Sequence, residues 1–332
     1  MKSIEAFNIN DAYEKIKELF SNEGNKFTYE NAEFYTIDSI LVNIKNNNNK
    51  IANICIAQNN IVSTLVEFLV VFSNFGINDK EREELLEIFQ PRNYYFDFNY
   101  LSVRDGNSIH DFLGENQLFT AYSILKSNIN TTRAVIGLYN PDSYINTKQP
   151  YAQPCQHYWY YLFKEDKLCL NVVLRSLSFE KGLLLINYFE WNCFLQMMAN
   201  WIDVPMGEIN IFIGRFSVDN NYLKKSSLLG TEPISKTINF DVKIKDFNND
   251  KYLVDRFLVL IKNKCNNVCL LKKISNQVKS EFLSTCLNLV IVYLLTSEGK
   301  NNDAKQIYDE LSVNELTSAC NDFFRRKWKE DK

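Results

Sequence analysis

The stretch QPCQHYWYYLFKEDKLCLNVVLRSLSFEKGLLLIN, residues 153–187, contains the features that decide the fold of this chain. Aromatic, β-branched and leucine residues fill two runs, 157–163 and 168–174, which predicts a pair of strands. The polar residues Lys164–Lys167 separate the runs and predict a turn, so the two strands are expected to form a hairpin. The apolar segment that follows predicts a long helix over 184–202. Strands beside a helix indicate an α/β chain.

The same periodicities continue on both sides of this stretch. Further strands are predicted over 33–45, 51–57, 134–139 and 208–213. Further helices are predicted over 10–22, 60–75, 79–89, 117–127, 275–297 and 303–328. No internal repeat is visible. We therefore expect an α/β (α+β) body over residues 1–265 and a helical extension over 266–332.

Composition excludes several classes of protein. The 332 residues are 46% apolar and 23% charged, which is ordinary for a globular protein. This composition excludes a protein that is disordered over its whole length. A net charge of −3 supplies no positive field for phosphates, so bulk nucleic-acid binding is not expected. No apolar run reaches the roughly 18 residues of a membrane helix, and the first residues lack a signal-peptide pattern. We therefore expect a soluble, cytoplasmic protein.

The numbers of cysteine and histidine residues argue against several kinds of site. Eight cysteines in a chain of this length do not make a dense disulfide framework. With only His110 and His157, neither a Ser-His-Asp triad nor a multi-histidine zinc site is expected. Cys265 and Cys269 lack a second ligand pair, so no metal site is predicted there. The basic segment Arg325–Trp328 is interpreted as a solvated helix end.

Cys155 and Arg175 are the pair most able to carry chemistry. They lie twenty residues apart at the open ends of the predicted hairpin, so antiparallel pairing can make them neighbours. A guanidinium near a thiol lowers the thiol pKa and raises the fraction of reactive thiolate, and it can also hold a phosphate in fork geometry. The alternative is a cysteine buried for packing beside a surface arginine, and the spacing alone favours that alternative.

A set of motifs occurs in a characteristic order along the chain. Pro154–Cys155 is followed twenty residues later by Arg175–Ser176, and Gly182 and Asn187 come next. The other members of the set are Glu67–Val71, Asn116–Leu118, Thr131–Arg133, Met197–Ala199, Gly207–Glu208 and Asn220–Asn221. Together, over residues 10–260, these motifs resemble the thymidylate synthase family and its relatives, the pyrimidine-nucleotide hydroxymethylases.

The resemblance implies a thymidylate synthase-like fold, a mixed sheet with flanking helices, in a homodimer. It implies one-carbon transfer to C5 of a pyrimidine nucleotide, with 5,10-methylenetetrahydrofolate as donor and a methyl or hydroxymethyl product. Cys155 would add to C6, because C5 is otherwise too electron-poor to attack. Glu67 would relay protons through water; alone in an apolar helix, it is expected to have a raised pKa. The alternative for Glu67 is an exposed helix residue.

The resemblance also implies how the nucleotide is bound. Arg175, Ser176 and the partner subunit's Arg133 would hold the 5′-phosphate. Asn187 would read the O4/N3 edge of the base, because its amide both donates and accepts hydrogen bonds. The alternative for Asn187 is an ordinary helix cap.

Several pocket positions depart from the family pattern. Gln156 takes the place of the histidine that follows the cysteine, and Ser217 and Asp219 take the places of the histidine and tyrosine that bind the ribose hydroxyl. Ser178 stands where the family has an aspartate that contacts folate, and Thr132 replaces one of two phosphate-binding arginines.

Longer segments depart as well. Residues 27–35 contain no Arg-Thr-Gly loop, and the helical extension replaces the C-terminal segment that closes over folate. Gly182 and Asn187 are separated by one residue more than in the family. If that extra residue lies elsewhere, Ile186 takes the place of the asparagine and base recognition is lost. A catalytically silent scaffold that acts through protein–protein interaction is therefore the alternative to an enzyme.

Overall fold

The computed structural model describes residues 2–29, 32–45, 47–48, 50–51, 61–75, 79–89, 116–138, 155–225, 236–265 and 267–330. The chain divides into two compact units. The first unit consists of Met1–Ile54 and Asp97–Thr231, and the second consists of Cys55–Phe96 and Glu232–Lys332. The helices expected as an extension over 266–332 thus share the second unit with segments from the expected body, 1–265.

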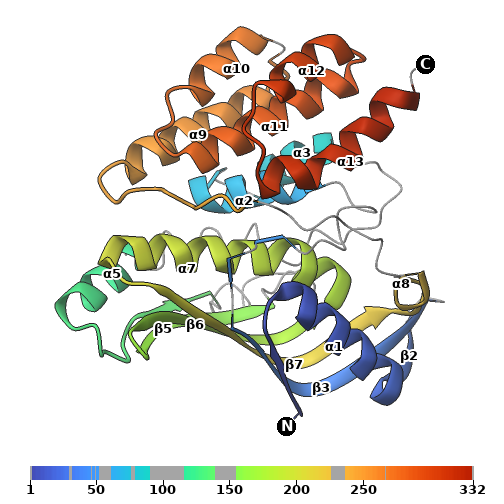
Figure 1. Cartoon of the computed structure of the whole chain (residues 1–332), viewed down its shortest axis with the longest axis vertical. Coiled ribbons are helices and arrows are strands. Elements are labelled where there is room, and N and C mark those ends of the chain that lie inside the picture. The colour runs from blue at the N-terminus through green and yellow to red at the C-terminus, as the bar shows by residue number, and fades with distance from the viewer. Residues whose placement is uncertain are drawn as a thin grey trace. The chain divides into compact units, whose positions relative to one another are not determined.

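The first unit is built on a seven-stranded sheet (Figure 1). Its strands are β1 (Lys2–Ala6), β2 (Asn25–Tyr29), β3 (Ala32–Ile44), β4 (Val135–Gly137), β5 (Gln156–Lys164), β6 (Lys167–Ser178) and β7 (Met206–Asp219). The order across the sheet is β1-β3-β7-β6-β5-β4, and β2 also pairs with β3. Two pairs, β1–β3 and β6–β7, are parallel and the others are antiparallel. The expected mixed sheet is confirmed.

The predicted hairpin is present as β5 and β6. Glu165 and Asp166 form the two-residue turn of this hairpin. Both have positive φ, 51° and 58°, which is the conformation of a tight hairpin turn that matches the twist of the strands. β7 is much longer than the predicted 208–213, since it pairs along its length with two long neighbours, β3 and β6. The strand predicted over 51–57 lies outside the described residues except for its first position, which is not in a strand.

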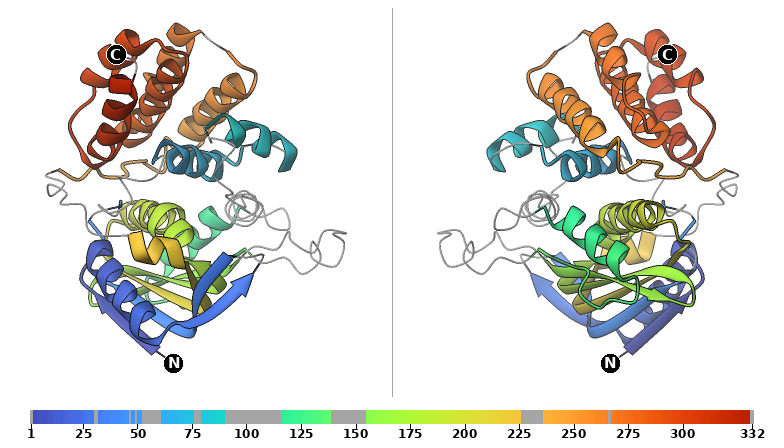
Figure 2. Two further views of the ribbon diagram at one scale, coloured as in Figure 1. Left: turned by 90° about the vertical axis from the view of Figure 1, so that its right-hand side faces the viewer. Right: turned by 90° about the vertical axis from the view of Figure 1, so that its left-hand side faces the viewer.

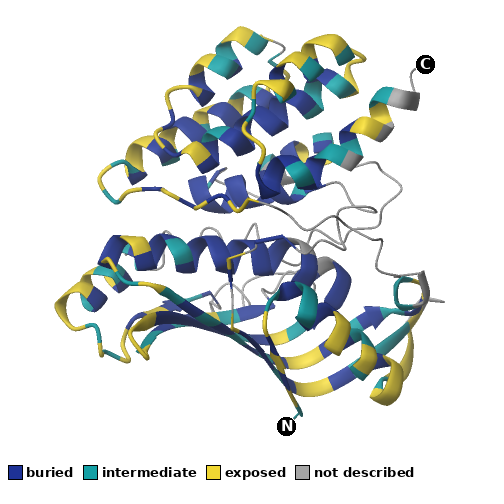
Figure 3. Ribbon diagram, viewed as in Figure 1, coloured by how far each residue is buried: buried dark blue, intermediate teal, exposed yellow. Residues whose placement is uncertain are grey.

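The helices of the first unit pack their apolar faces on this sheet. They are α1 (Ile9–Glu23), α5 (Gln117–Ser127), the π-helix η4 (Phe179–Asn187), α7 (Tyr188–Ile202) and α8 (Asn220–Lys225). α7 lies across one face of the sheet, and nearly all of its side chains are buried (Figure 3). Phe20 of α1 packs on Phe179 and on Phe216 of β7, which places α1 against the same core.

The pairing of β7 with β3 is interrupted beside Arg175. It skips Ser39, which has a φ of 57°, and continues on the other side in the same register. On the other side of β7, a Cβ placed on Gly214 would lie 2.5 Å from the main-chain oxygen of Arg175 in β6. Only glycine allows β6 and β7 to approach this closely, so Gly214 determines where the main chain of Arg175 lies.

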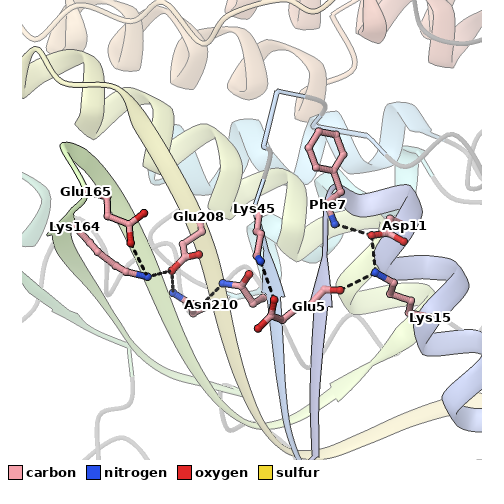
Figure 4. A network of polar contacts seen from close by, with 10 residues as sticks. Glu5, Phe7, Asp11, Lys15, Lys45, Lys164, Glu165, Glu208 and Asn210 are labelled. Carbon is pink, nitrogen blue, oxygen red and sulfur yellow. Dashed lines mark hydrogen bonds and ion pairs between the residues drawn. The ribbon is translucent and has the colours of Figure 1, made fainter.

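Polar side chains connect strands at one end of the sheet (Figure 4). Lys45, directly after β3, pairs with Glu5 of β1 at 2.7 Å, and Lys164 of β5 pairs with Glu208 of β7 at 3.2 Å. Asn210 donates to Glu208 at 3.5 Å. Exposed ion pairs contribute only about 0–1 kcal/mol each, so this network orients the strands more than it stabilises them.

The second unit is helical (Figure 2). Its helices are α2 (Ile61–Ser73), α3 (Asp79–Leu86), α9 (Phe247–Lys262), α10 (Val268–Ser275), α11 (Glu281–Ser297), α12 (Asn301–Asp309) and α13 (Glu315–Glu330), and a 3-10 turn (Glu87–Phe89) follows α3. Phe68 and Phe72 of α2 pack edge-on against Phe240, and Phe68 also packs on Phe282 of α11. This aromatic cluster gives the second unit a core of its own.

Two of the predicted helices differ in the structure. The helix predicted over 303–328 is broken into α12 and α13, because Asn314 caps α13 by accepting hydrogen bonds from two main-chain N–H groups at 2.9 and 3.2 Å. The helix predicted over 275–297 begins at Glu281, because the Ser280 hydroxyl caps α11. Within the part of the chain that the structure describes, no helix is long and apolar enough to cross a membrane.

Candidate active site

The hairpin brings Cys155 and Arg175 together, as the spacing predicted. The main-chain N–H of Arg175 donates to the main-chain oxygen of Cys155 at 3.0 Å. The Ser176 hydroxyl donates to the Cys155 sulfur at 3.4 Å, and Nη1 of Arg175 donates to that hydroxyl at 3.4 Å. Cys155 is 7% exposed, whereas Arg175 is exposed. A hydroxyl donor and a cation thus face a nearly buried sulfur, an arrangement that stabilises negative charge on it.

His157 lies beside this group without being part of a triad. The pairing of β5 with β6 passes from Gln156 to Tyr158 and leaves His157 in a β-bulge. Burial lowers the pKa of His157 below its ordinary value of 6.5, and the positive charge of Arg175 lowers it further. The imidazole is therefore neutral at pH 7.

Gln156 is buried on the side of the sheet that packs against α7. Its Oε1 accepts hydrogen bonds from Nε1 of Trp159 at 2.7 Å and from Nε1 of Trp191 at 2.8 Å. Trp159 lies in the same strand and Trp191 lies in α7, so one carboxamide ties the strand that follows Cys155 to the helix. The sequence predicted Gln156 as a site residue but did not show its two indole donors.

A π-helix contains both Gly182 and Asn187. In η4, a π-helix over Phe179–Asn187, hydrogen bonds span five residues instead of four, so each turn holds one residue more than an α-helical turn. A Cβ on Gly182 would lie 3.2 Å from Oδ1 of Asn187, which shows that these residues, five apart, face each other. π-Helical turns are often found at functional sites.

The side chain of Asn187 does not cap α7. Asn187 precedes the first residue of the helix, but its own backbone is helical and its side chain makes no capping hydrogen bond. The residue is fully buried, and neither Oδ1 nor Nδ2 has a hydrogen-bond partner among the described residues. The helix-cap alternative is therefore wrong, and both a donor and an acceptor remain for a ligand.

A buried network holds the first turn of α7 in place. The Tyr188 hydroxyl donates to Oδ1 of Asn47 at 2.9 Å, and Nδ2 of Asn47 donates to the main-chain oxygen of Gly207 at 2.7 Å. Asn192, one turn further along α7, donates to the main-chain oxygen of Asn47 at 2.7 Å. No pattern in the sequence distinguishes Asn47, because it lies in the run of four asparagines at 46–49.

The residues expected at the sugar lie near the end of β7. The Ser217 hydroxyl donates to the main-chain oxygen of Leu177 at 3.5 Å. Oδ1 of Asp219 accepts from the main-chain N–H groups of Asn221 and Tyr222 at 2.6 and 3.2 Å. Asp219 thus caps α8, and this capping role explains an aspartate at the end of β7 without any contact to a ligand.

Arg133 lies between α5 and β4. Its side chain is exposed, and its main-chain N–H donates to the hydroxyl of Thr131 at 3.1 Å. An exposed guanidinium on a short loop can reach a neighbouring molecule.

Glu67 belongs to the second unit and Cys155 to the first. Glu67 is 2% exposed and lies in the middle of α2, whose other residues are apolar or uncharged. The alternative of an exposed helix residue is therefore wrong. Among the residues that the structure describes, no group of three or more His, Cys, Asp or Glu side chains could hold a metal ion.

Comparison with solved structures agrees with the fold. The chain is similar to the thermostable thymidylate synthase A of Bacillus subtilis, with a TM-score of 0.54 and 20% sequence identity over 73% of this chain and 91% of that chain. No protein-family model and no curated protein sequence matches the chain. At this identity the likeness shows the fold alone, so the thymidylate synthase-like architecture, a mixed sheet with flanking helices, is confirmed.

Proposed function

We propose that this protein transfers a one-carbon unit to C5 of a pyrimidine nucleotide through a covalent adduct with Cys155. The observation that carries the proposal is the Cys155–Ser176–Arg175 group, which lies in the same unit as the fully buried amide of Asn187, an amide with no hydrogen-bond partner among the described residues. A nucleophile and a base-reading amide are the minimum that this chemistry requires.

The reaction follows from the chemistry of the ring. The Cys155 thiolate forms a bond to C6, and the electron pair of the 5,6 double bond moves onto C5 and the O4 oxygen, where it acts as an enolate. C5 then bonds to the one-carbon unit, whose bond to the donor's amine nitrogen breaks, and C5 loses its proton to water. The methylene group left on C5 would take up water, which gives a hydroxymethyl group, or a hydride supplied by the reduced donor, which gives a methyl group. This addition re-forms the 5,6 double bond of the ring and expels the Cys155 thiolate.

The carbon donor in this proposal is 5,10-methylenetetrahydrofolate, which when bound supplies the electrophilic carbon. A pterin presents N–H donors, which a carboxylate accepts. Ser178 at the end of β6 offers only a hydroxyl, but Glu180 follows two residues later and is 8% exposed. Oε1 of Glu180 accepts from the main-chain N–H of Asp219 at 3.3 Å, which holds the carboxylate near the sugar-binding residues. In this proposal Glu180 is the residue that would hold the pterin.

The nucleotide would be bound by residues from four segments and a second subunit. Arg175 and Ser176 hold the phosphate together with the partner subunit's Arg133, in a homodimer, and the exposed guanidinium of Arg133 supports this arrangement. Asn187 contacts the base. The Ser217 hydroxyl contacts the ribose, and Gln156, directly after Cys155, is the remaining residue assigned to the nucleotide.

Release of tritium from C5 tests the proposal. The protein is incubated with methylenetetrahydrofolate and with dUMP, UMP, dCMP or CMP that carries tritium at C5. We expect release from at least one nucleotide, loss of release in Cys155→Ser, and normal release in Cys169→Ser, a second nearly buried cysteine in the same sheet. If no nucleotide releases tritium under conditions in which an ordinary thymidylate synthase works, the proposal is wrong.

A catalytically silent scaffold is the second candidate, and the burial of Cys155 favours it. The two candidates differ in the reactivity of this thiol. Alkylation of Cys155 is followed against pH, with Cys155→Ser to subtract the other cysteines. A thiol that titrates well below the free value of about 8.5 supports the enzyme, and an inert thiol supports the scaffold.

A further inference from the structure

Arg215 is an exposed arginine of β7 that the proposed function does not use. In the parallel pairing of β6 with β7, its Cα is the partner of the Cα of Ser176. Ser176 is the residue whose hydroxyl donates to the Cys155 sulfur at 3.4 Å and accepts from Nη1 of Arg175 at 3.4 Å. The stem of Arg215 therefore begins beside the residue that contacts both the nucleophile and a phosphate-binding arginine.

The side chain of Arg215 leaves the sheet on the side that carries the hydroxyls of Ser176 and Ser217. Cross-strand partners lie on the same side of a sheet, as do residues two apart in one strand. Phe216, between Arg215 and Ser217, points to the other side, where it is fully buried and packs on Phe20. The side chain of Arg215, by contrast, is 61% exposed. Its guanidinium is thus open to solvent on the side where the proposed phosphate and ribose contacts lie.

Asp38 of β3 holds one edge of this guanidinium. Nε and Nη2 of Arg215 donate to the two carboxylate oxygens of Asp38 at 2.8 and 3.2 Å. These hydrogen bonds lower the pKa of Asp38 and raise that of Arg215, so both groups are charged at pH 7. A guanidinium has five N–H groups, of which this ion pair uses two. The edge formed by Nη1 and Nη2 still offers two parallel N–H groups, which is the fork geometry that binds a phosphate.

The proposed phosphate site has few other cations. Thr132 stands in the place of a phosphate-binding arginine, and residues 27–35 contain no Arg-Thr-Gly loop. Within one subunit, Arg175 is the only arginine that the resemblance assigns to the phosphate. A phosphate monoester carries a charge of about −1.5 to −2 at pH 7, so a single guanidinium leaves part of that charge unmatched.

We propose that Arg215 is a second phosphate-binding arginine of the same subunit, oriented by Asp38. The inference rests on the proposed function and adds a binding residue to that site. A phosphate that accepts from the Ser176 hydroxyl is bound by Arg175 from β6 and by the Nη1–Nη2 edge of Arg215 from β7. The site therefore takes a nucleoside monophosphate and discriminates against the nucleoside.

Arg215→Ala tests the inference, because an exposed ion pair contributes little to stability and its loss should leave the protein folded. Dissociation constants of the full-length protein are measured by calorimetry for dUMP, UMP, dCMP and CMP and for the corresponding nucleosides. Since a charge-assisted phosphate contact is lost, we expect the nucleotide that wild type binds most tightly to bind about tenfold more weakly to Arg215→Ala. Its nucleoside should bind equally to both proteins.

Arg256→Ala is the matched control. Arg256 is also an exposed arginine, but it lies in α9 of the second unit. Nucleotide affinity should not change in this variant. If Arg215→Ala does not fold, Arg215→Gln keeps most of the stem and an N–H donor for Asp38 without the positive charge, and it should weaken nucleotide binding by a similar factor.

The outcomes separate this inference from the proposed function. An unchanged nucleotide affinity in Arg215→Ala, or in Arg215→Gln where the alanine variant does not fold, overturns the role of Arg215 and leaves the proposed function standing. An equal loss for the nucleotide and its nucleoside does the same, because the nucleoside has no phosphate. If the folded wild type binds none of the four nucleotides, both the proposed function and the inference are overturned.

Discussion

Replacing Gly214 with alanine should disturb the sheet at the point where it carries Arg175. The added Cβ would lie 2.5 Å from the main-chain oxygen of Arg175 and 3.3 Å from its carbonyl carbon. A carbon and an oxygen normally approach no closer than about 3.3 Å, so a shift of roughly 0.8 Å is needed. The obstacle is main chain, not the end of a flexible side chain, and a strand must therefore move.

The expected cost follows from the size of this shift. Overpacking that forces the backbone to move costs about 1–3 kcal/mol. With a urea dependence of about 2 kcal/mol/M, the unfolding midpoint should fall by roughly 0.5–1.5 M. Nucleotide binding should weaken as well, because the N–H of Arg175 is bonded to the carbonyl oxygen of Cys155, and a displaced β6 displaces both residues.

Urea unfolding followed by tryptophan fluorescence measures the effect, since Trp159, Trp191 and Trp201 all lie in the first unit. Gly137→Ala is the control, because a Cβ there would lie 3.7 Å from Oε1 of Gln117, an ordinary contact. We expect Gly137→Ala to remain within about 1 kcal/mol of wild type. Equal midpoints for Gly214→Ala and Gly137→Ala would refute the reasoning.

Three further predictions concern single side chains. Arg133→Ala should leave the protein folded but weaken nucleotide binding at least about tenfold, since a charge-assisted phosphate contact is worth roughly 1.5–3 kcal/mol; unchanged binding in calorimetry would show that the phosphate is held elsewhere. Because burial and the charge of Arg175 lower the pKa of His157, the unfolded chain binds more protons than the folded one just below pH 6.5. Stability should therefore fall as the pH drops through that range, and His157→Gln should reduce this pH dependence of the urea midpoint; an identical dependence in both proteins would contradict it. Asn47→Ala removes the acceptor of the Tyr188 hydroxyl in a buried network. Urea unfolding should show a free energy of unfolding about 2–3 kcal/mol lower than that of wild type. A loss below about 0.5 kcal/mol, as is usual for surface changes, would show that the network is dispensable.

Local sequence was sufficient to predict most of the secondary structure. The β5–β6 hairpin follows from two apolar runs around a short polar turn, and α5 begins and ends where the pattern predicted, at Gln117 and Ser127. These features depend on side-chain periodicity and on residues a few positions apart, so they can be predicted from the sequence without the tertiary structure. The proximity of Cys155 and Arg175 also follows from the sequence, because a hairpin pairs residues at fixed spacing.

Only the tertiary structure decided how these elements serve a site. The orientation of the Gln156 amide depends on Trp191, 35 residues away, and Asn47 contacts Gly207, 160 residues away. The π-helix before Asn187 was not predicted, since an extra residue in a helical turn leaves the apolar pattern almost unchanged. The first two features share one physical reason. Hydrogen bonds between segments distant in the sequence depend on how helices pack on the sheet, and no local pattern records that packing.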